Sequence, residues 1–352
     1  MVLSPGPIEL TYLGRSNVKR TISFFALTAL MAGALAARGQ SYSSTVSLPN
    51  VSGITVYNGV PEGFDPVSAA DSQLEDYGYP RRPDPGDTKA YGNWVKAVST
   101  TRITPQLSIN ANVVHRANQR KGAPTAASSS TVASESLNWS GFSLTAAGAP
   151  FREVVGLWVV PSLSNQFKSF TGYESEWVGI DGNCNCNDLV QDGTEQDWTG
   201  GKPSYYAWVE FIPEPEVKIN NFPVSPGDVI YAYSSIGKKN GVVTGFYYIA
   251  NYNTRKSVST SLAIPKNTKF SGLTAEWVME RTEVNGSFSR PLPFYARAYM
   301  DNAVAYRNGS NRAINYASEA NENITMIQGN TPLSKAVVQD ADSLWFDWVA
   351  YF

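Results

Sequence analysis

The chain has 352 residues, of which 16% are charged, and its formal net charge at pH 7 is −2. So small a charge excludes nucleic acid and anionic membrane surfaces as the main partners. The charge is unevenly distributed. Residues 1–133 hold 12 basic and 8 acidic residues, whereas residues 134–352 hold 16 basic and 22 acidic ones. A basic first part therefore precedes an acidic remainder.

The N-terminus has the features of a secretory signal peptide. Two basic residues, Lys19 and Arg20, precede an apolar run at residues 22–35 that ends in small residues. The run is too short, and too soon followed by polar residues, to span a membrane. We therefore expect residues 1–38 to be a removed leader, with the true start near Val18, and the mature chain to be secreted.

The next part of the chain predicts a largely irregular extension with two short helices. Residues 40–65 are rich in Ser, Pro, Gly and Val and predict extended or irregular chain. Helix-capping patterns begin at Ser68 and at Asp87. We interpret residues 39–120 as a pro-segment or an N-terminal module, and residues 121–136, whose composition is typical of flexible chain, as a linker.

Residues 137–352 have the sequence texture of an all-β domain. Short apolar or alternating runs, rich in β-branched and aromatic residues, are separated by turn residues, as in VVGLWVVPS, YYAWVEFIP and TAEWVMERTE. Hardly any segment has helical spacing. We predict an antiparallel double-sheet β-sandwich behind the partly helical extension.

The residue types exclude several kinds of active site. His115 is the only histidine and lies before the β domain, which excludes Ser-His-Asp, Cys-His and histidine-zinc sites within that domain. We expect His115 to be solvated. Phosphate-loop, dinucleotide and G-x-S-x-G motifs are missing, so we expect no cofactor. Cys184 and Cys186 predict a loop disulfide or free thiols, not a metal site.

Carboxylates, amides and aromatic rings remain as candidates. Strand alternation places Glu276 and Glu280 on one face of TAEWVME, and Trp208 with Glu210 on one face of AWVEF. Charged side chains in strands are either solvated on an outer face or belong to a site. The pattern leaves both interpretations open.

Eight strings between residues 137 and 294 resemble, in the same order, those of the glutamic peptidases, or eqolisins. They are LNWSG (137–141), LWVVPS (157–162), WVGIDG (177–182), LVQDG (189–193), AWVEFIP (207–213), VSPGDVI (224–230), TAEWVMERTE (274–283) and PLPF (291–294). The resemblance implies a secreted endopeptidase that acts on polypeptides at acid pH and has a concanavalin A-like fold.

The same resemblance implies a catalytic pair, Gln191 and Glu276. Glu276 would act as general base and then general acid toward a water molecule, while Gln191 would donate an N–H to the oxyanion. Because the partner is a neutral amide, we expect Glu276 to stay ionised in acid. Asp192 departs from the family pattern, although alternation should turn it away from Gln191; Gln196 is the fallback amide. The implied substrate-binding residues are Trp177, Asp181, Trp208 and Glu210.

Two other functions fit the aromatic and acidic residues. One is a lectin-like sandwich whose exposed rings stack on sugars, and the other is a glycoside hydrolase that uses two of Glu210, Glu276 and Glu280. Neither requires Gln191.

The uneven charge suggests in addition that the basic residues 40–133 cover the acidic domain at neutral pH and are released by acid. We expect a monomer.

Overall fold

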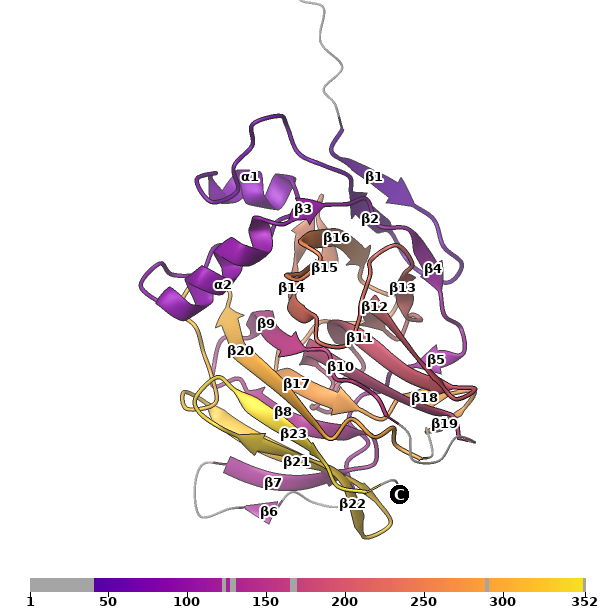
Figure 1. The fold of residues 1–352 in the computed structure, drawn as a ribbon. Helices are drawn as coiled ribbons and strands as arrows, with labels where there is room; N and C mark the ends of the chain where they lie inside the picture. The colour runs from indigo at the N-terminus through magenta and orange to yellow at the C-terminus, as the bar shows by residue number, and fades with distance from the viewer. Residues whose placement is uncertain (1–40, 122–124, 127–130, 165–169, 289–290, 351–352) are drawn as a thin grey trace, which may run out of the picture. The chain divides into compact units, whose positions relative to one another are not determined.

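The computed structural model describes residues 41–121, 125–126, 131–164, 170–288 and 291–350 (Figure 1). The predicted leader lies outside these residues. Among the helices that the structure describes, none has both the length and the apolar character needed to cross a bilayer. Strands make up most of the regular structure, as the sequence predicts.

The first of two layers is an antiparallel sheet. In spatial order its strands are β1 (Ser43–Val46), β2 (Ile54–Tyr57), β16 (Lys256–Ala263), β15 (Val242–Asn251), β14 (Val229–Lys239), β9 (Phe151–Val159), β20 (Arg297–Arg307), β23 (Leu344–Trp348) and β22 (Thr331–Val338). The short β3 (Thr101–Arg102) pairs parallel with β16.

The second layer carries the predicted site residues. In spatial order its strands are β21 (Ala320–Gln328), β8 (Trp139–Thr145), β17 (Thr274–Glu280), β10 (Gly172–Asp181), β11 (Leu189–Thr199), β12 (Lys202–Ile212), β13 (Val217–Ile219) and β4 (Leu107–Ile109). The β21–β22 hairpin joins the two layers. A small separate sheet contains β5 (Val113–Val114), β18 (Glu283–Val284) and β19 (Ser287–Phe288). The predicted double-sheet sandwich is confirmed.

The hydrophobic core lies between the layers, because alternate side chains of each strand point into it. Its fully or almost fully buried residues include Phe142, Val178, Val190 and Trp277 from the second sheet and Trp158, Ile230 and Ile249 from the first. Two indole groups also tie the layers together. Trp158 Nε1 donates to Thr194 Oγ1 at 3.0 Å, and Trp277 Nε1 donates to Val155 O at 2.7 Å.

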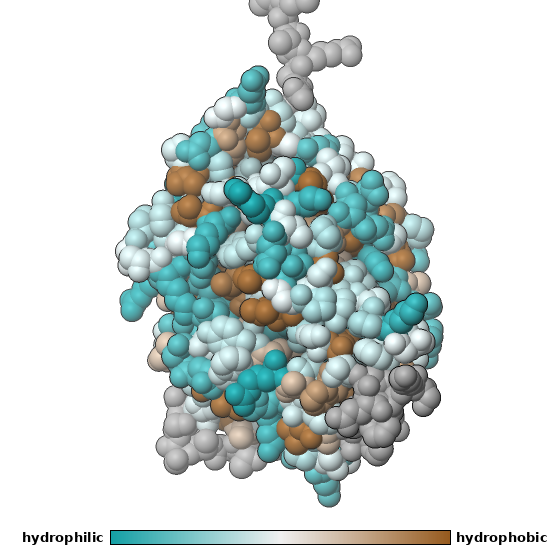
Figure 2. Space-filling model, viewed as in Figure 1, coloured by the Kyte–Doolittle hydropathy of each residue, from teal (hydrophilic) through white to brown (hydrophobic). Residues whose placement is uncertain are grey.

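The far side of the first sheet is covered by the extension. Helix α2 (Thr88–Val98) begins at the predicted cap Asp87, whose Oδ1 accepts the Ala90 N–H at 3.0 Å. The apolar side of α2 packs through Trp94 against β14 and β15, for example against Tyr248. In Figure 1 both helices lie beside these strands. Figure 2 shows hydrophobic residues only in small groups among hydrophilic ones, which agrees with a core between the layers.

Two details of the extension differ from the predictions. Helix α1 (Asp71–Asp76) begins after Ala70 and not at Ser68, because the Ser68 hydroxyl donates to Asp65 Oδ2 at 2.7 Å. Within the predicted linker, β7 (Thr131–Ser136) pairs parallel with β21, and β6 (Thr125–Ala126) pairs with β7. The backbone of β21 offers hydrogen-bond partners there, so this part of the linker is sheet.

Candidate active site

Gln191 and Glu276 lie in one row of residues across the second sheet. Gly179 of β10 pairs with Gln191 of β11 on one side and with Glu276 of β17 on the other. The row continues to Glu210 on β12 and Ser143 on β8. Directly opposed residues of antiparallel strands point to the same face. The fold therefore brings the predicted pair together on the side away from the core, which we call the site face.

Gly179 places no side chain between the two residues. Their strands are two apart, so their Cα atoms are about 10 Å from each other. Gln191 Nε2 donates to Glu210 Oε2 at 2.6 Å, and the Ser143 hydroxyl donates to Glu276 Oε1 at 3.4 Å. Among the described residues, Gln191 Oε1 and Glu276 Oε2 have no hydrogen-bond partner. Each side chain thus keeps one acceptor without a partner among the described residues.

Burial changes the pKa of the Glu276 carboxyl. The side chain is fully buried, and burial, aided by the nearby Asp181, raises the pKa of the Glu276 carboxyl well above its ordinary value. The Thr274 hydroxyl, and to a smaller extent the Ser143 hydroxyl and the Asn183 backbone, oppose this only in part. The expectation of a carboxylate that stays ionised in acid considered only the neutral amide partner, and burial acts on the Glu276 pKa in the opposite direction.

Trp177 and Trp208 lie in the neighbouring row of the site face, on either side of Gly193. Their indole N–H groups donate to Glu280 Oε2 at 2.9 Å and to Ser175 Oγ at 3.0 Å. Both rings are fully buried and belong to a small apolar cluster on this face. Both rings pack in this cluster and also border the Gln191–Glu276 row, for which the resemblance implies substrate binding.

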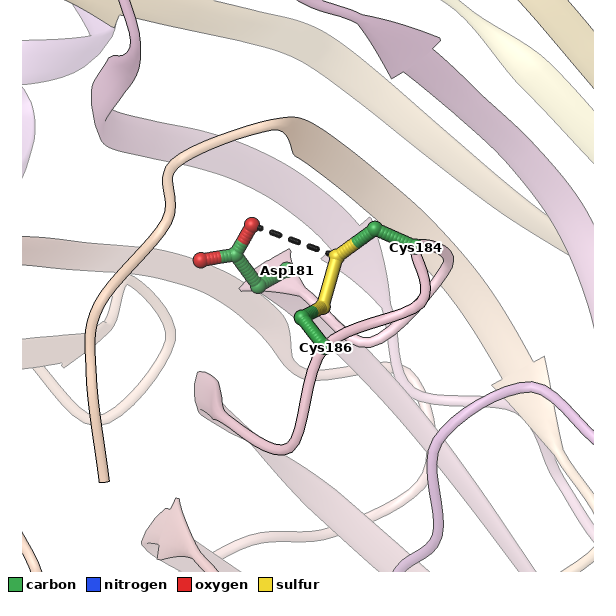
Figure 3. A group of neighbouring side chains, drawn as sticks. All are labelled: Asp181, Cys184 and Cys186. Atoms are coloured by element: carbon green, nitrogen blue, oxygen red, sulfur yellow. Dashed lines mark hydrogen bonds between the residues drawn. A yellow bond between two sulfur atoms is a disulfide. The ribbon is translucent and has the colours of Figure 1, made fainter. Parts of the chain in front are cut away.

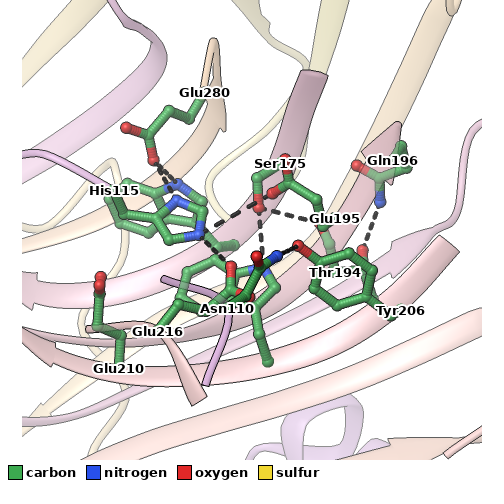
Figure 4. A network of polar contacts seen from close by, with 12 residues as sticks. Asn110, His115, Ser175, Thr194, Glu195, Gln196, Tyr206, Glu210, Glu216 and Glu280 are labelled. Atoms are coloured by element: carbon green, nitrogen blue, oxygen red, sulfur yellow. Dashed lines mark hydrogen bonds and ion pairs between the residues drawn. The ribbon is translucent and has the colours of Figure 1, made fainter. Parts of the chain in front are cut away.

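His115 is the site residue that the sequence does not predict. The expectation of a solvated side chain is wrong, since His115 is 2% exposed and stacks on Trp208 with ring centroids 3.9 Å apart. Its Nδ1 lies 3.0 Å from Glu280 Oε2 and its Nε2 lies 3.0 Å from Glu216 Oε2 (Figure 4). These contacts join residues 165 and 101 positions apart, so no local pattern reveals them.

A metal ion is one conceivable occupant of this cluster, because donor atoms of His115, Glu195 and Glu216 lie within 4.8 Å of one another. In the structure, however, both imidazole nitrogens already contact carboxylates. Burial lowers the pKa of His115, but its hydrogen bonds to Glu216 and Glu280 outweigh this and hold the pKa well above its ordinary value. We interpret the cluster as a cation site filled by the chain's own imidazolium.

Asp181 accepts hydrogen bonds from the chain that leads into β17. Its Oδ2 accepts the Gly272 N–H at 2.7 Å, and its Oδ1 accepts the Leu273 N–H at 2.8 Å. Asp181 therefore fixes the chain that leads into the strand of Glu276, and its contact with substrate stays a prediction. The neighbouring Cys184 and Cys186 form the loop disulfide that the sequence allowed (Figure 3). Disulfide sulfurs are not thiolates, the form in which cysteine binds metals.

Asp192 points away from the site face, as alternation predicts. Its side chain is fully buried toward the first sheet, where Ser234 Oγ donates to Asp192 Oδ1 at 2.7 Å. Gln196 shares this orientation and donates to Thr194 Oγ1 at 2.6 Å. Of the two candidate amides, only Gln191 therefore lies beside Glu276.

Replacing Asp192 with asparagine should make stability less dependent on pH. Burial raises the pKa of Asp192 to about 8, against about 3.9 in an unfolded chain. The folded chain thus binds more protons between these values, and its stability falls as the pH rises from about 4 to 8. Asparagine removes this fall, a gain of up to about 4 kcal/mol at pH 7 relative to pH 4.

Urea unfolding at pH 4, 6 and 7.5 measures the effect of Asp192→Asn. Asp84→Asn, at an exposed aspartate, is the control and should leave the pH dependence unchanged. If Asp192→Asn loses stability with pH as steeply as the wild type, the buried carboxyl is not the cause.

Comparisons with known proteins concern the family and the fold of the chain. A sequence profile described as the Peptidase A4 family matches residues 137–347. The chain is 28% identical over 193 residues to aspergillopepsin-2 of Aspergillus niger and 31% identical over 161 residues to scytalidopepsin B of Scytalidium lignicola. These matches cover 50% and 45% of this chain, and 66% and 57% of the relatives, less than two thirds of either.

Solved structures share the fold. Scytalido-glutamic peptidase, crystallised with a transition state analog inhibitor, gives a TM-score of 0.51 at 23% identity. The likeness covers 60% of this chain and 98% of that one. At this identity the comparison supports the two-sheet fold only. The chemistry of the site is inferred from its residues.

Proposed function

Because the chain belongs to the Peptidase A4 family, we propose that it is an endopeptidase that hydrolyses peptide bonds at acid pH through Gln191 and Glu276. The observation that supports this proposal is that both residues pair with Gly179, so that an amide and a carboxyl lie on one face with only a glycine between them. A water molecule between them would contact both side chains. The row needs no histidine, metal or cofactor to begin hydrolysis.

Each side chain of the row has a chemical task. Ionised Glu276 takes a proton from the water as it attacks the carbonyl carbon, and then returns that proton to the leaving amine. Gln191 Nε2 donates to the oxyanion that forms on the carbonyl oxygen. In the covered site this N–H donates to Glu210, so Glu210 orients the Gln191 amide and the substrate oxygen competes for its N–H. Trp177 and Trp208 line the adjoining part of the face.

Polypeptides are the proposed substrates, and the mature chain acts outside the cell after its leader is removed. Sugar hydrolysis would use two of the carboxyls on the site face and would leave Gln191 without a task. Peptide hydrolysis uses both members of the pair.

The test compares the two substrate classes. The full chain is incubated at pH 3.5 and at pH 7 with casein and with a plant polysaccharide, and new amino termini and new reducing ends are measured. We expect new amino termini at pH 3.5 alone, and none with Glu276→Gln. New reducing ends, or casein cleavage that Glu276→Gln leaves intact, would overturn the proposal.

A further inference from the structure

Two glutamates of β10, Glu174 and Glu176, point into the core and not toward the site face. They alternate along the strand with Trp177 of the site face, and Glu176 lies opposite Met279 of β17, a core residue. Neither glutamate has any solvent exposure. A buried carboxyl group needs hydrogen-bond partners or a cation in place of the water that it has lost. The groups around these two side chains therefore indicate what binds there.

No described residue supplies such a partner. All four carboxyl oxygens of Glu174 and Glu176 lack a hydrogen-bond partner among the residues that the structure describes. Among the same residues, no lysine, arginine or histidine lowers the pKa of either carboxyl, as a nearby positive charge would. The buried Glu153 of the first sheet differs in this respect, because it pairs with Arg81 at 2.9 Å. Two acidic groups thus lie in the core without a donor or counter-charge from the described chain.

Gln196 brings an amide oxygen to the same place. It lies directly opposite Glu174 in the pairing of β10 with β11, so both side chains are on the core face with their Cβ atoms about 5 Å apart. Gln196 is fully buried, and its Nε2 donates to Thr194 Oγ1 at 2.6 Å (Figure 4). Its Oε1 has no hydrogen-bond partner among the described residues. The amide is therefore anchored by its nitrogen and leaves its oxygen beside Glu174.

The hydroxyl of Tyr295, which lies near the two glutamates, donates its hydrogen elsewhere. Burial and the charges of Glu174 and, more weakly, Glu176 raise the pKa of Tyr295 well above its ordinary value, which places the ring near both carboxyls. The Tyr295 hydroxyl nevertheless donates to Ser334 Oγ, at 2.6 Å. The oxygens gathered at this point of the core therefore act as acceptors toward one another, an arrangement that a positive ion stabilises.

We propose that Glu174, Glu176 and Gln196 form a binding site for one calcium-like divalent cation in the core of the sandwich. Two carboxylates balance the charge of such an ion, and carboxylate and amide oxygens are the ligands that Ca²⁺ prefers. Ca²⁺ takes about six to eight oxygens in a flexible geometry, so water molecules complete its shell, whereas Mg²⁺ demands a near-ideal octahedron. The cation joins β10 to β11 from the core side. It is structural and has no part in the proposed hydrolysis on the site face.

Calcium content and thermal stability of the full-length chain at pH 7 test the site. The chain is purified from medium that contains CaCl₂, freed of loosely held ions by gel filtration, and analysed by elemental mass spectrometry. A second portion is unfolded in urea with EDTA and refolded with either CaCl₂ or EDTA, so that a buried ion can leave and enter. We expect about one Ca²⁺ per chain, and a melting temperature at least about 4 °C higher with CaCl₂ than with EDTA, because an ion that binds only the folded chain stabilises it.

Variants of the proposed ligands locate the ion. The double variant Glu174→Gln/Glu176→Gln keeps the size of both side chains and removes both charges, so it should hold no calcium and melt at the same temperature with CaCl₂ and EDTA. Gln196→Leu should keep only part of the rise. Glu195→Gln is the matched control. Glu195 follows Thr194 on β11 but belongs to the group around His115, so this variant should keep the calcium and the full rise.

Protons are the alternative occupants of the site, because burial raises the pKa of both glutamates well above the ordinary value. Wild-type chain that holds no calcium and melts at one temperature under both conditions would mean that protons neutralise the glutamates, and would overturn the proposal. So would calcium that Glu195→Gln loses and the double variant keeps, since it would place the ion beside His115. The measurement on purified wild type decides even if the double variant does not fold. None of these readouts needs peptidase activity, so the cation site and the proposed function can fail independently.

Discussion

Replacing Glu276 with glutamine should lower kcat/KM for peptide hydrolysis by about 100- to 10,000-fold, the usual contribution of general acid–base catalysis. Glutamine has nearly the same shape, and its carbonyl oxygen can still accept the hydrogen bond that Ser143 gives to Glu276 Oε1. What it lacks is the ability to take and return a proton. The loss should therefore appear in kcat, with KM and the melting temperature close to those of the wild type.

The control for Glu276→Gln is the same substitution at another glutamate. Glu153 is also buried, but it lies on β9 in the other sheet and pairs with Arg81. Both variants are acid-treated in the same way and assayed on the same peptide at pH 3.5. Activity above about a tenth of wild type in Glu276→Gln, with Glu153→Gln unchanged, would assign the proton transfers to another group.

The sequence predicts the two-sheet fold and the orientation of the pair because both depend on local alternation. A strand with period two must turn Glu276 away from a core that holds Trp277, and the same rule turns Asp192 away from Gln191. The pairing of Gln191 and Glu276 with Gly179 depends instead on which strands become neighbours. Alternation alone does not determine which strands pair with each other. The resemblance to the glutamic peptidases implied that Gln191 and Glu276 act together.

The burial of the candidate site and its contacts with His115 could not be predicted from the sequence. His115 looks like an ordinary polar residue of an irregular extension, and its importance comes from carboxylates far along the chain that the fold gathers around it. Glu276 is likewise fully buried by its folded surroundings, and this burial raises its pKa. Asp181 shows a related limit, because its backbone partners at Gly272 and Leu273 lie about ninety positions away. The role of a charged residue in this protein depends on contacts with residues far along the chain, which a local sequence pattern does not show.

Gly179→Ala should cost most of the activity, at least about 100-fold, because the side chain between Gln191 and Glu276 would occupy the place of the attacking water. A Cβ at Gly179 would lie 2.8 Å from Leu189 Cδ1 and 2.9 Å from Trp177 Cζ3. The leucine end can shift, whereas the Trp177 ring is held by its hydrogen bond to Glu280. The methyl group is therefore pushed toward the Gln191 and Glu276 side chains, and the overpacking should cost about 1–3 kcal/mol of stability.

Gly237→Ala separates these effects from the general cost of changing a strand glycine. Gly237 lies in β14, and a Cβ there meets no atom within 4 Å. Both variants are assayed for kcat/KM after acid treatment and for unfolding in urea. Because a loss of 1–3 kcal/mol leaves most proteins folded, a Gly179→Ala chain that is folded but inactive locates the water above Gly179. A folded Gly179→Ala chain with wild-type kcat/KM would mean that the water attacks from elsewhere and that the row is not the catalytic arrangement.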